Sequence, residues 1–170
     1  MRTSMAILVA AALAALPAAA QEKRDIKALS AEQTGQYLAG AGMGYARAAE
    51  LNRFPGPMHV LEFADRLGLS PEQRERTRAL MDAHKAEARA TGAKLVEAER
   101  ALDALFASGI VDEAGLARAV AAAAALEASY RLSHLDTHRR MRALLSEEQV
   151  SRYVELRGYA ASGRPHGDKH

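Results

Sequence analysis

The amino-acid sequence predicts an all-α protein, a small bundle of four to five helices built on one long helical hairpin. Apolar and small residues recur every three or four positions from Met81 to Leu105 and again from Leu116 to Leu144, which is the spacing of helices packed on one side. Alanine supplies 39 of the 170 residues, and alanine favours helices while burying little area. The phrase L-S-x-E-Q also occurs three times, each time where a helix can begin.

Residues 1–20 have the pattern of a secretory signal peptide. Arg2 precedes an apolar run from Met5 to Leu16, and Ala18 and Ala20 are the small residues expected just before a cleavage site. The apolar run is too short to be a permanent membrane anchor. We therefore expect a soluble exported protein that is located in the periplasm of a Gram-negative cell.

The composition of the chain limits its domain organisation and its chemistry. We expect one helical domain at residues 21–161 and a disordered polar tail at residues 162–170. The chain has no cysteine, which excludes disulfides, thiol catalysis and thiolate metal ligands. The formal net charge is only +2 and both signs are mixed along the helices, so no nucleic-acid partner is expected. No nucleophile elbow, phosphate loop or dinucleotide fingerprint occurs, and we expect no enzymatic activity.

The first half of the predicted domain contains two helices. The first runs from Glu32 to Leu51, although four glycines at positions 35, 40, 42 and 44 weaken it. The sequence NRFPGP at residues 52–57 predicts a turn. A short helix from Met58 to Leu67 follows, with apolar side chains available for burial.

The second half contains the hairpin and one further helix. A long helix is expected from Pro71 to Phe106, and the next helix begins at Asp112 or Glu113. Because the joining loop has only a few residues, the two helices should fold back on each other as an antiparallel pair. The last helix is expected from Glu147 to about Gly158.

The repeated phrase is interpreted as a signal that ends one helix and begins another. Ser70 can cap the new helix, Pro71 fits its first position, and Gln73 can reach back to complete a capping box. Gly68 can end the preceding helix in the left-handed conformation, with Leu69 as the apolar residue that follows it. The later copy offers the same roles to Leu145, Ser146 and Gln149, and the copy at residues 29–33 is expected to be only a cap.

Two of these phrases enclose the hairpin, and this arrangement in a small exported helical protein resembles the LTxxQ family. The resemblance covers roughly Met58 to Tyr159, with Ser in place of the more usual Thr. The family includes the Spy and CpxP periplasmic chaperones and the related zinc-resistance-associated and CnrX-type heavy-metal sensors. It implies an elongated, cradle-shaped antiparallel homodimer.

The leading functional prediction is an ATP-independent chaperone that binds unfolded or partly folded periplasmic proteins during envelope stress. This function requires no cofactor, and CpxP-like relatives also act on a membrane sensor kinase. Clients would contact shallow apolar patches among basic side chains. The candidate contacts are Phe54, Met58, Val60, Leu61, Phe63, Arg66, Arg74, Arg78 and Lys85. The alternative for the apolar members is that they fill the core.

The second prediction is a periplasmic heavy-metal sensor or resistance protein. His134 and His138 are four residues apart and share one helix face, a spacing that can hold one metal ion. Folding the hairpin near residue 110 places His84 and Met81 close to this pair, with Met141 one turn further along. Such a His and Met cluster suits zinc, nickel, cobalt or copper. The alternative is that these histidines are neutral core residues.

Overall fold

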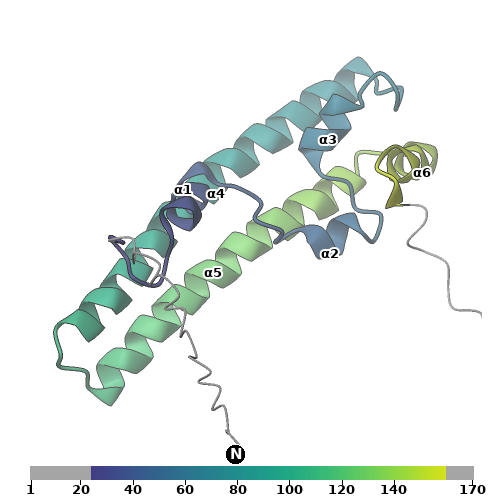
Figure 1. The fold of residues 1–170 in the computed structure, drawn as a ribbon. Helices are drawn as coiled ribbons and strands as arrows, with labels where there is room; N and C mark the ends of the chain where they lie inside the picture. The colour runs from purple at the N-terminus through teal and green to yellow at the C-terminus, as the bar shows by residue number, and fades with distance from the viewer. Residues whose placement is uncertain (1–23, 160–170) are drawn as a thin grey trace, which may run out of the picture.

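The computed structural model describes residues 24–159, and within that range it is built of helices without strands (Figure 1). Its six helices are α1 (Ala31–Ala39), α2 (Arg47–Glu50), α3 (Pro57–Glu62), α4 (Pro71–Ala107), α5 (Glu113–Arg142) and α6 (Glu147–Leu156). The all-α prediction is therefore confirmed. The predicted signal peptide and the predicted polar tail lie outside the described residues. In the described part of the chain, no helix combines the length and the apolar character needed to cross a membrane.

The helix predicted from Glu32 to Leu51 is wrong as a single element, which is why the described residues contain more helices than the four to five expected. Gly40 ends α1 in the left-handed conformation with φ of 69°. Met43 and Gly44 also have positive φ values, 45° and 80°. Backbone in this region cannot continue an α-helix. An irregular crossing segment, residues 40–46, therefore separates α1 from the four-residue α2.

Helices α4 and α5 form the predicted antiparallel hairpin and lie side by side over most of their length (Figure 1). They contain 37 and 30 residues. Helix α4 ends at Ala107 with Ser108 as its C-cap, and Asp112 caps α5 by accepting a hydrogen bond from the Gly115 N–H at 2.6 Å. The short loop between them fixes which residues face each other across the hairpin.

Helix α1 lies directly against the backbone of α4. A Cβ atom placed on Gly92 of α4 would come within 2.0 Å of the carbonyl oxygen of Tyr37 and 3.1 Å of the Tyr130 ring. Glycine therefore allows a close approach of two backbones at this point. The Tyr130 hydroxyl, from α5, donates a 2.6 Å hydrogen bond to the Ala41 carbonyl oxygen and holds the start of the crossing segment.

The main hydrophobic core lies at the end of the hairpin that is remote from its loop, where α3 and α6 cover α4 and α5. Its buried members come from all four helices and from the residues that link them: Val60, Ala64, Leu67, Leu69, Leu80, Met141, Leu145, Val150 and Tyr153. Burial of an apolar side chain contributes about 1.5–3 kcal/mol. This cluster therefore fixes the positions of the two short helices on the hairpin.

All three L-S-x-E-Q phrases form capping boxes, with Ser30, Ser70 and Ser146 as the N-caps. In each phrase the serine hydroxyl accepts from the backbone N–H of the glutamine three residues on, and that glutamine's side chain accepts from the serine N–H. The capping interpretation of the sequence is confirmed for every copy.

The two glutamines that enclose the hairpin also bind each other. Nε2 of Gln73 donates to Oε1 of Gln149 at 2.9 Å, and Nε2 of Gln149 donates to Oε1 of Gln73 at 3.0 Å. Each amide reaches one more carbonyl: Gln73 donates to Leu144 at 2.8 Å, and Gln149 donates to Leu67 at 3.3 Å. This glutamine pair, Gln73 with Gln149, joins the N-termini of α4 and α6. Gln33 of the first copy is exposed and serves only as a cap.

Candidate metal centre

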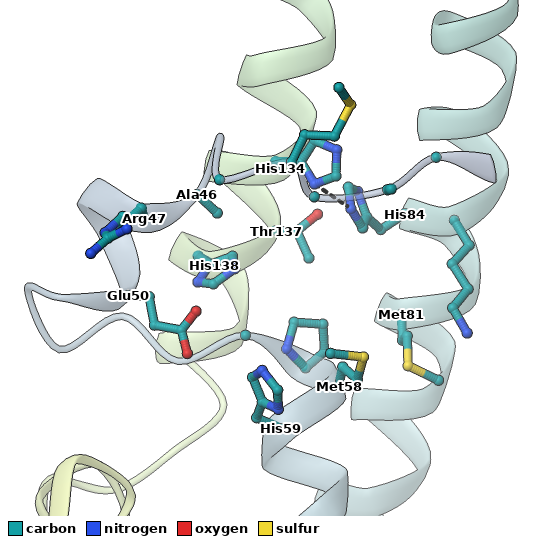
Figure 2. Close-up of a pocket in the computed structure, with 18 of the residues that line it drawn as sticks. Ala46, Arg47, Glu50, Met58, His59, Met81, His84, His134, Thr137 and His138 are labelled. Atoms are coloured by element: carbon teal, nitrogen blue, oxygen red, sulfur yellow. Dashed lines mark hydrogen bonds between the residues drawn. The ribbon is translucent and has the colours of Figure 1, made fainter. Parts of the chain in front are cut away.

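A cavity of about 710 Å³ lies between α4, α5 and the chain that runs from the end of α1 to α3 (Figure 2). The four histidines that the structure describes, His59, His84, His134 and His138, all line it. The described part of the chain contains four methionines, and three of them, Met43, Met58 and Met81, line the same cavity. Apart from Met141, the potential histidine and methionine ligands of this part of the protein are thus gathered at one place.

His84 of α4 and His134 of α5 are in direct contact, as the dashed line in Figure 2 shows. Nε2 of His84 and Nδ1 of His134 are 3.0 Å apart. The ring centroids are separated by 4.4 Å and the planes are nearly perpendicular, at 77°. The contact follows from the hairpin, because the short loop brings these positions of α4 and α5 opposite each other.

Burial keeps both imidazoles of this pair neutral. It lowers the pKa of His84, with a smaller contribution from His138. Burial, followed by the neighbouring His84 and then His138, lowers the pKa of His134 to about 4. A neutral imidazole is the form that binds metal ions. The pair is therefore ready to act as a ligand at neutral pH without losing a proton first.

The outer nitrogens of the pair, Nδ1 of His84 and Nε2 of His134, are buried and have no hydrogen-bond partner. A neutral imidazole carries one N–H, so when the inner nitrogens share a hydrogen bond, one outer nitrogen holds a proton and the other a lone pair. A buried polar atom without a partner costs about 1–3 kcal/mol. Unsatisfied buried groups of this kind are uncommon in a purely structural contact.

The separation of the inner nitrogens fits a metal ion. Bonds from imidazole to zinc are about 2.0–2.1 Å long, so two nitrogens on one ion of this size would be about 3 Å apart at a right angle and about 3.3 Å apart in the tetrahedral geometry of zinc. Within the described residues, no group of three or more His, Cys, Asp or Glu side chains converges closely enough to hold a metal. The imidazole pair, His84 with His134, therefore needs further ligands of another kind or a movement of the cavity wall.

The other predicted metal ligands have different positions. His138 lies on the cavity wall, where its Nδ1 donates to the Phe54 carbonyl oxygen at 2.8 Å. Met81 lines the cavity. Met141 does not, because α3 and α6 cover that part of α5 and place it, fully buried, in the hydrophobic core. The sequence interpretation did not assign His59 or Met43 to the site, and it placed Met58 only among client contacts.

Aromatic side chains fix the orientation of His134. The Tyr45 ring stacks on it at 6.3 Å and 14°, and the Tyr130 ring lies 4.8 Å away. The Tyr45 hydroxyl is itself held by Tyr37 and Glu127, each at 3.0 Å. A ligand whose ring is held in this way loses little freedom when an ion binds.

The only carboxylate among the described residues that line the cavity is already engaged. Oε1 of Glu50 accepts hydrogen bonds from the hydroxyls of Tyr153 at 2.9 Å and Tyr159 at 3.1 Å, and it lies 3.1 Å from the guanidinium of Arg157. Burial alone would raise the pKa of Glu50, but the Tyr153 hydrogen bond and the Arg157 charge outweigh it and lower the pKa. Glu50 therefore links the cavity wall to α6 as a charged structural group.

The predicted client contacts do not form one surface. Val60 is fully buried, and Phe63 packs against the core beside Tyr153, at 6.3 Å between ring centroids. Phe54 and Met58 are exposed, and Leu61 is half-buried. Of the basic candidates, Arg66 lies over the Phe63 ring and Arg74 forms an ion pair with Asp65 at 2.7 Å. Arg78 is exposed, and Lys85 lines the cavity. For Val60 and Phe63, the core-filling alternative describes the observed positions.

A comparison with known protein families gives a match over residues 35–152 to the model of a family described as heavy-metal resistance. No curated protein and no solved structure matches the chain. The matched range includes α4, α5 and all four described histidines. It agrees with the resemblance to the LTxxQ proteins, whose relatives include CnrX-type metal sensors. The chain belongs to the heavy-metal resistance family.

Proposed function

We propose that the protein binds a transition-metal ion in the cavity, with His84 and His134 as the first two ligands, and that it serves periplasmic metal resistance or sensing. The observation that carries this proposal is the imidazole pair beside the cavity: its rings are neutral, its inner nitrogens lie 3.0 Å apart, His134 is buried and His84 is half-buried. The family assignment supports the metal function, which was the second of the two predictions from sequence.

The pair would bind the ion through the nitrogens that now share a hydrogen bond. Each ring would then carry its proton on the outer nitrogen, so that binding needs no net release of a proton from the pair. Binding lowers the concentration of free ion, which is sufficient for a resistance function. A sensing function also needs a structural response, and the Glu50 contacts with Tyr153 and Tyr159 give the cavity wall a direct connection to α6.

Titration calorimetry of the mature full-length chain with Zn²⁺, Ni²⁺, Co²⁺ and Cu²⁺ tests the proposal. We expect at least one ion to bind with a Kd below about 10 μM, and His84→Gln or His134→Gln to weaken binding by at least about tenfold. Arg78→Gln is the matched control, because Arg78 is exposed on α4 and does not line the cavity. The proposal is refuted if neither these ions nor Cu⁺ bind, or if binding is unaffected by both histidine variants.

A chaperone function is the second candidate, supported by the family resemblance and by exposed apolar side chains on the hairpin. Phe106, Ile110 and Leu132 are 58%, 80% and 66% exposed. Such side chains can hold unfolded clients weakly. If the protein is a chaperone, near-stoichiometric amounts should slow the aggregation of several unrelated clients, and Phe106→Ser with Ile110→Ser should reduce the effect. The resemblance also supports a homodimer and a regulatory contact with a membrane sensor kinase. Crosslinking in cells would test both contacts.

A further inference from the structure

We propose that the cavity selects a soft monovalent ion, Cu⁺ or its analogue Ag⁺, over Zn²⁺, Ni²⁺ and Co²⁺, with methionine sulfurs joining the imidazole pair. This inference rests on the proposed metal-binding function and specifies its substrate. Three features of the cavity carry it: the positions of the methionines, the lack of available anionic ligands, and the charge of the lining.

The methionines of the cavity do not serve as core residues. Met43 comes from the crossing segment, Met58 from α3 and Met81 from α4, so three separate segments each contribute a methionine to the lining of one cavity. Met58 is 54% exposed, and Met43 and Met81 are half-buried. Met141, by contrast, is fully buried in the core. Figure 2 shows Met58 and Met81 on the cavity wall below the imidazole pair.

Methionine usually fills irregular gaps in a core, and that role does not explain three partly exposed thioethers around one cavity. Thioether sulfur is a soft ligand that selects Cu⁺ among the biological metals. Since the chain contains no cysteine, methionine is the only soft ligand that it has. The combination of neutral imidazole and thioether is therefore the ligand set that this cavity can offer.

Carboxylate ligands for a divalent ion are in short supply at the same place. The cavity-lining residues within 24–159 include one carboxylate, Glu50, whose Oε1 already receives contacts from Tyr153, Tyr159 and Arg157. Zinc sites in proteins usually have four ligands, and octahedral ions prefer oxygen. Cu⁺ needs fewer ligands, and soft ones.

The charge of the lining also favours a low ionic charge. Arg47, Lys85 and Arg89 line the cavity and contribute three positive charges against the single negative charge of Glu50. Repulsion from these cations acts on a divalent ion with twice the strength that it has on a monovalent ion. Because imidazole and thioether are neutral, they do not offset that repulsion. Cu⁺ and Ag⁺ therefore meet the smaller penalty.

The test measures Cu⁺ binding under anaerobic conditions by competition with a chromogenic Cu⁺ chelator, using the mature full-length chain. We expect Cu⁺ to bind at least about 100-fold more tightly than Zn²⁺ or Ni²⁺. The triple variant Met43→Leu, Met58→Leu, Met81→Leu should weaken Cu⁺ binding by at least about tenfold and leave divalent binding unchanged. Met141→Leu is the matched control, with binding like that of the wild type.

Two further measurements make the test independent of the folding of the triple variant. X-ray absorption of the Cu⁺-loaded wild type should show sulfur as well as nitrogen scatterers. The single variant Met58→Leu, at an exposed position, should already weaken Cu⁺ binding. Nitrogen scatterers alone, or Cu⁺ binding no tighter than that of Zn²⁺ and Ni²⁺, would overturn the inference.

The outcomes separate the two proposals. Divalent binding that depends on His84 and His134, combined with weak Cu⁺ binding, would refute the selectivity and leave the proposed function intact. If no ion of either class binds, both proposals are lost. Tight Cu⁺ binding that requires both the imidazole pair and the three methionines would support both.

Discussion

Replacing Gln73 with Ala should destabilise the protein far more than the loss of a helix cap. In the structure the Gln73 amide takes part in four hydrogen bonds: with the Ser70 N–H, with the Leu144 carbonyl and twice with Gln149. At about 0.5–1 kcal/mol for each hydrogen bond, the expected loss is about 2–4 kcal/mol. Gln33→Ala is the matched control, because Gln33 completes the same capping box without a distant partner. It should cost about 0.5 kcal/mol.

A double-mutant cycle in urea isolates the contact between the two glutamines. Gln149→Ala should cost about as much as Gln73→Ala, and because two hydrogen bonds are shared, the double variant should cost about 1–2 kcal/mol less than the sum. The free energy of unfolding of all four proteins gives the coupling. Full additivity, or a Gln33→Ala loss equal to that of Gln73→Ala, would show that the phrases act only as local caps.

Two other predictions concern stability. Gly92→Ala should destabilise the protein by about 1–3 kcal/mol, because its Cβ would lie 2.0 Å from the Tyr37 carbonyl oxygen. The control is Gly35→Ala, in open space on α1, which should be neutral or stabilising by up to about 1 kcal/mol. Urea unfolding of both variants measures the two changes in the free energy of unfolding. Stability should also fall as the pH drops from about 6.5, where histidine ordinarily titrates, towards 4, the lowered pKa of His134. The sign follows because the unfolded chain binds a proton on this histidine that the folded chain does not. His134→Gln should have a flatter profile, and an unchanged slope would contradict the assigned burial of His134.

Metal affinity should follow the same titration, because a proton and a metal ion compete for the imidazole nitrogens. We expect binding to be nearly constant from pH 8 to about 6 and to weaken towards pH 4, measured by calorimetry at each pH. Affinity that is independent of pH over this whole range would exclude His84 and His134 as ligands.

Several features of the protein could be predicted from sequence because local interactions fix them. The expected helix from Pro71 to Phe106 is observed from Pro71 to Ala107, and Asp112 is the observed cap of α5. Capping depends on residues within one helical turn. The proximity of His84 to the face of His134 also followed from local facts, since a short loop and a constant rise per residue fix the register of an antiparallel pair.

Other features depend on contacts between segments that are far apart in the chain. The glutamine pair joins residues separated by 76 positions, and the same phrase at Gln33 forms no such pair. Met141 shares the helical spacing of the cavity residues but is core, because α3 and α6 cover that end of α5. No local pattern in the sequence distinguishes these alternatives.

The arrangement of the cavity shows the same limit. The sequence predicts three imidazoles on one hairpin, those of His84, His134 and His138. His59, Met43 and Met58 reach the cavity only because helix α1 ends at Gly40 and the crossing segment then passes over α5. Helix formation, capping and hairpin register result from forces that act within a few residues, so the chain specifies them locally. The assembly of ligands from four segments results from packing over the whole fold, which the order of residues along the chain does not reveal.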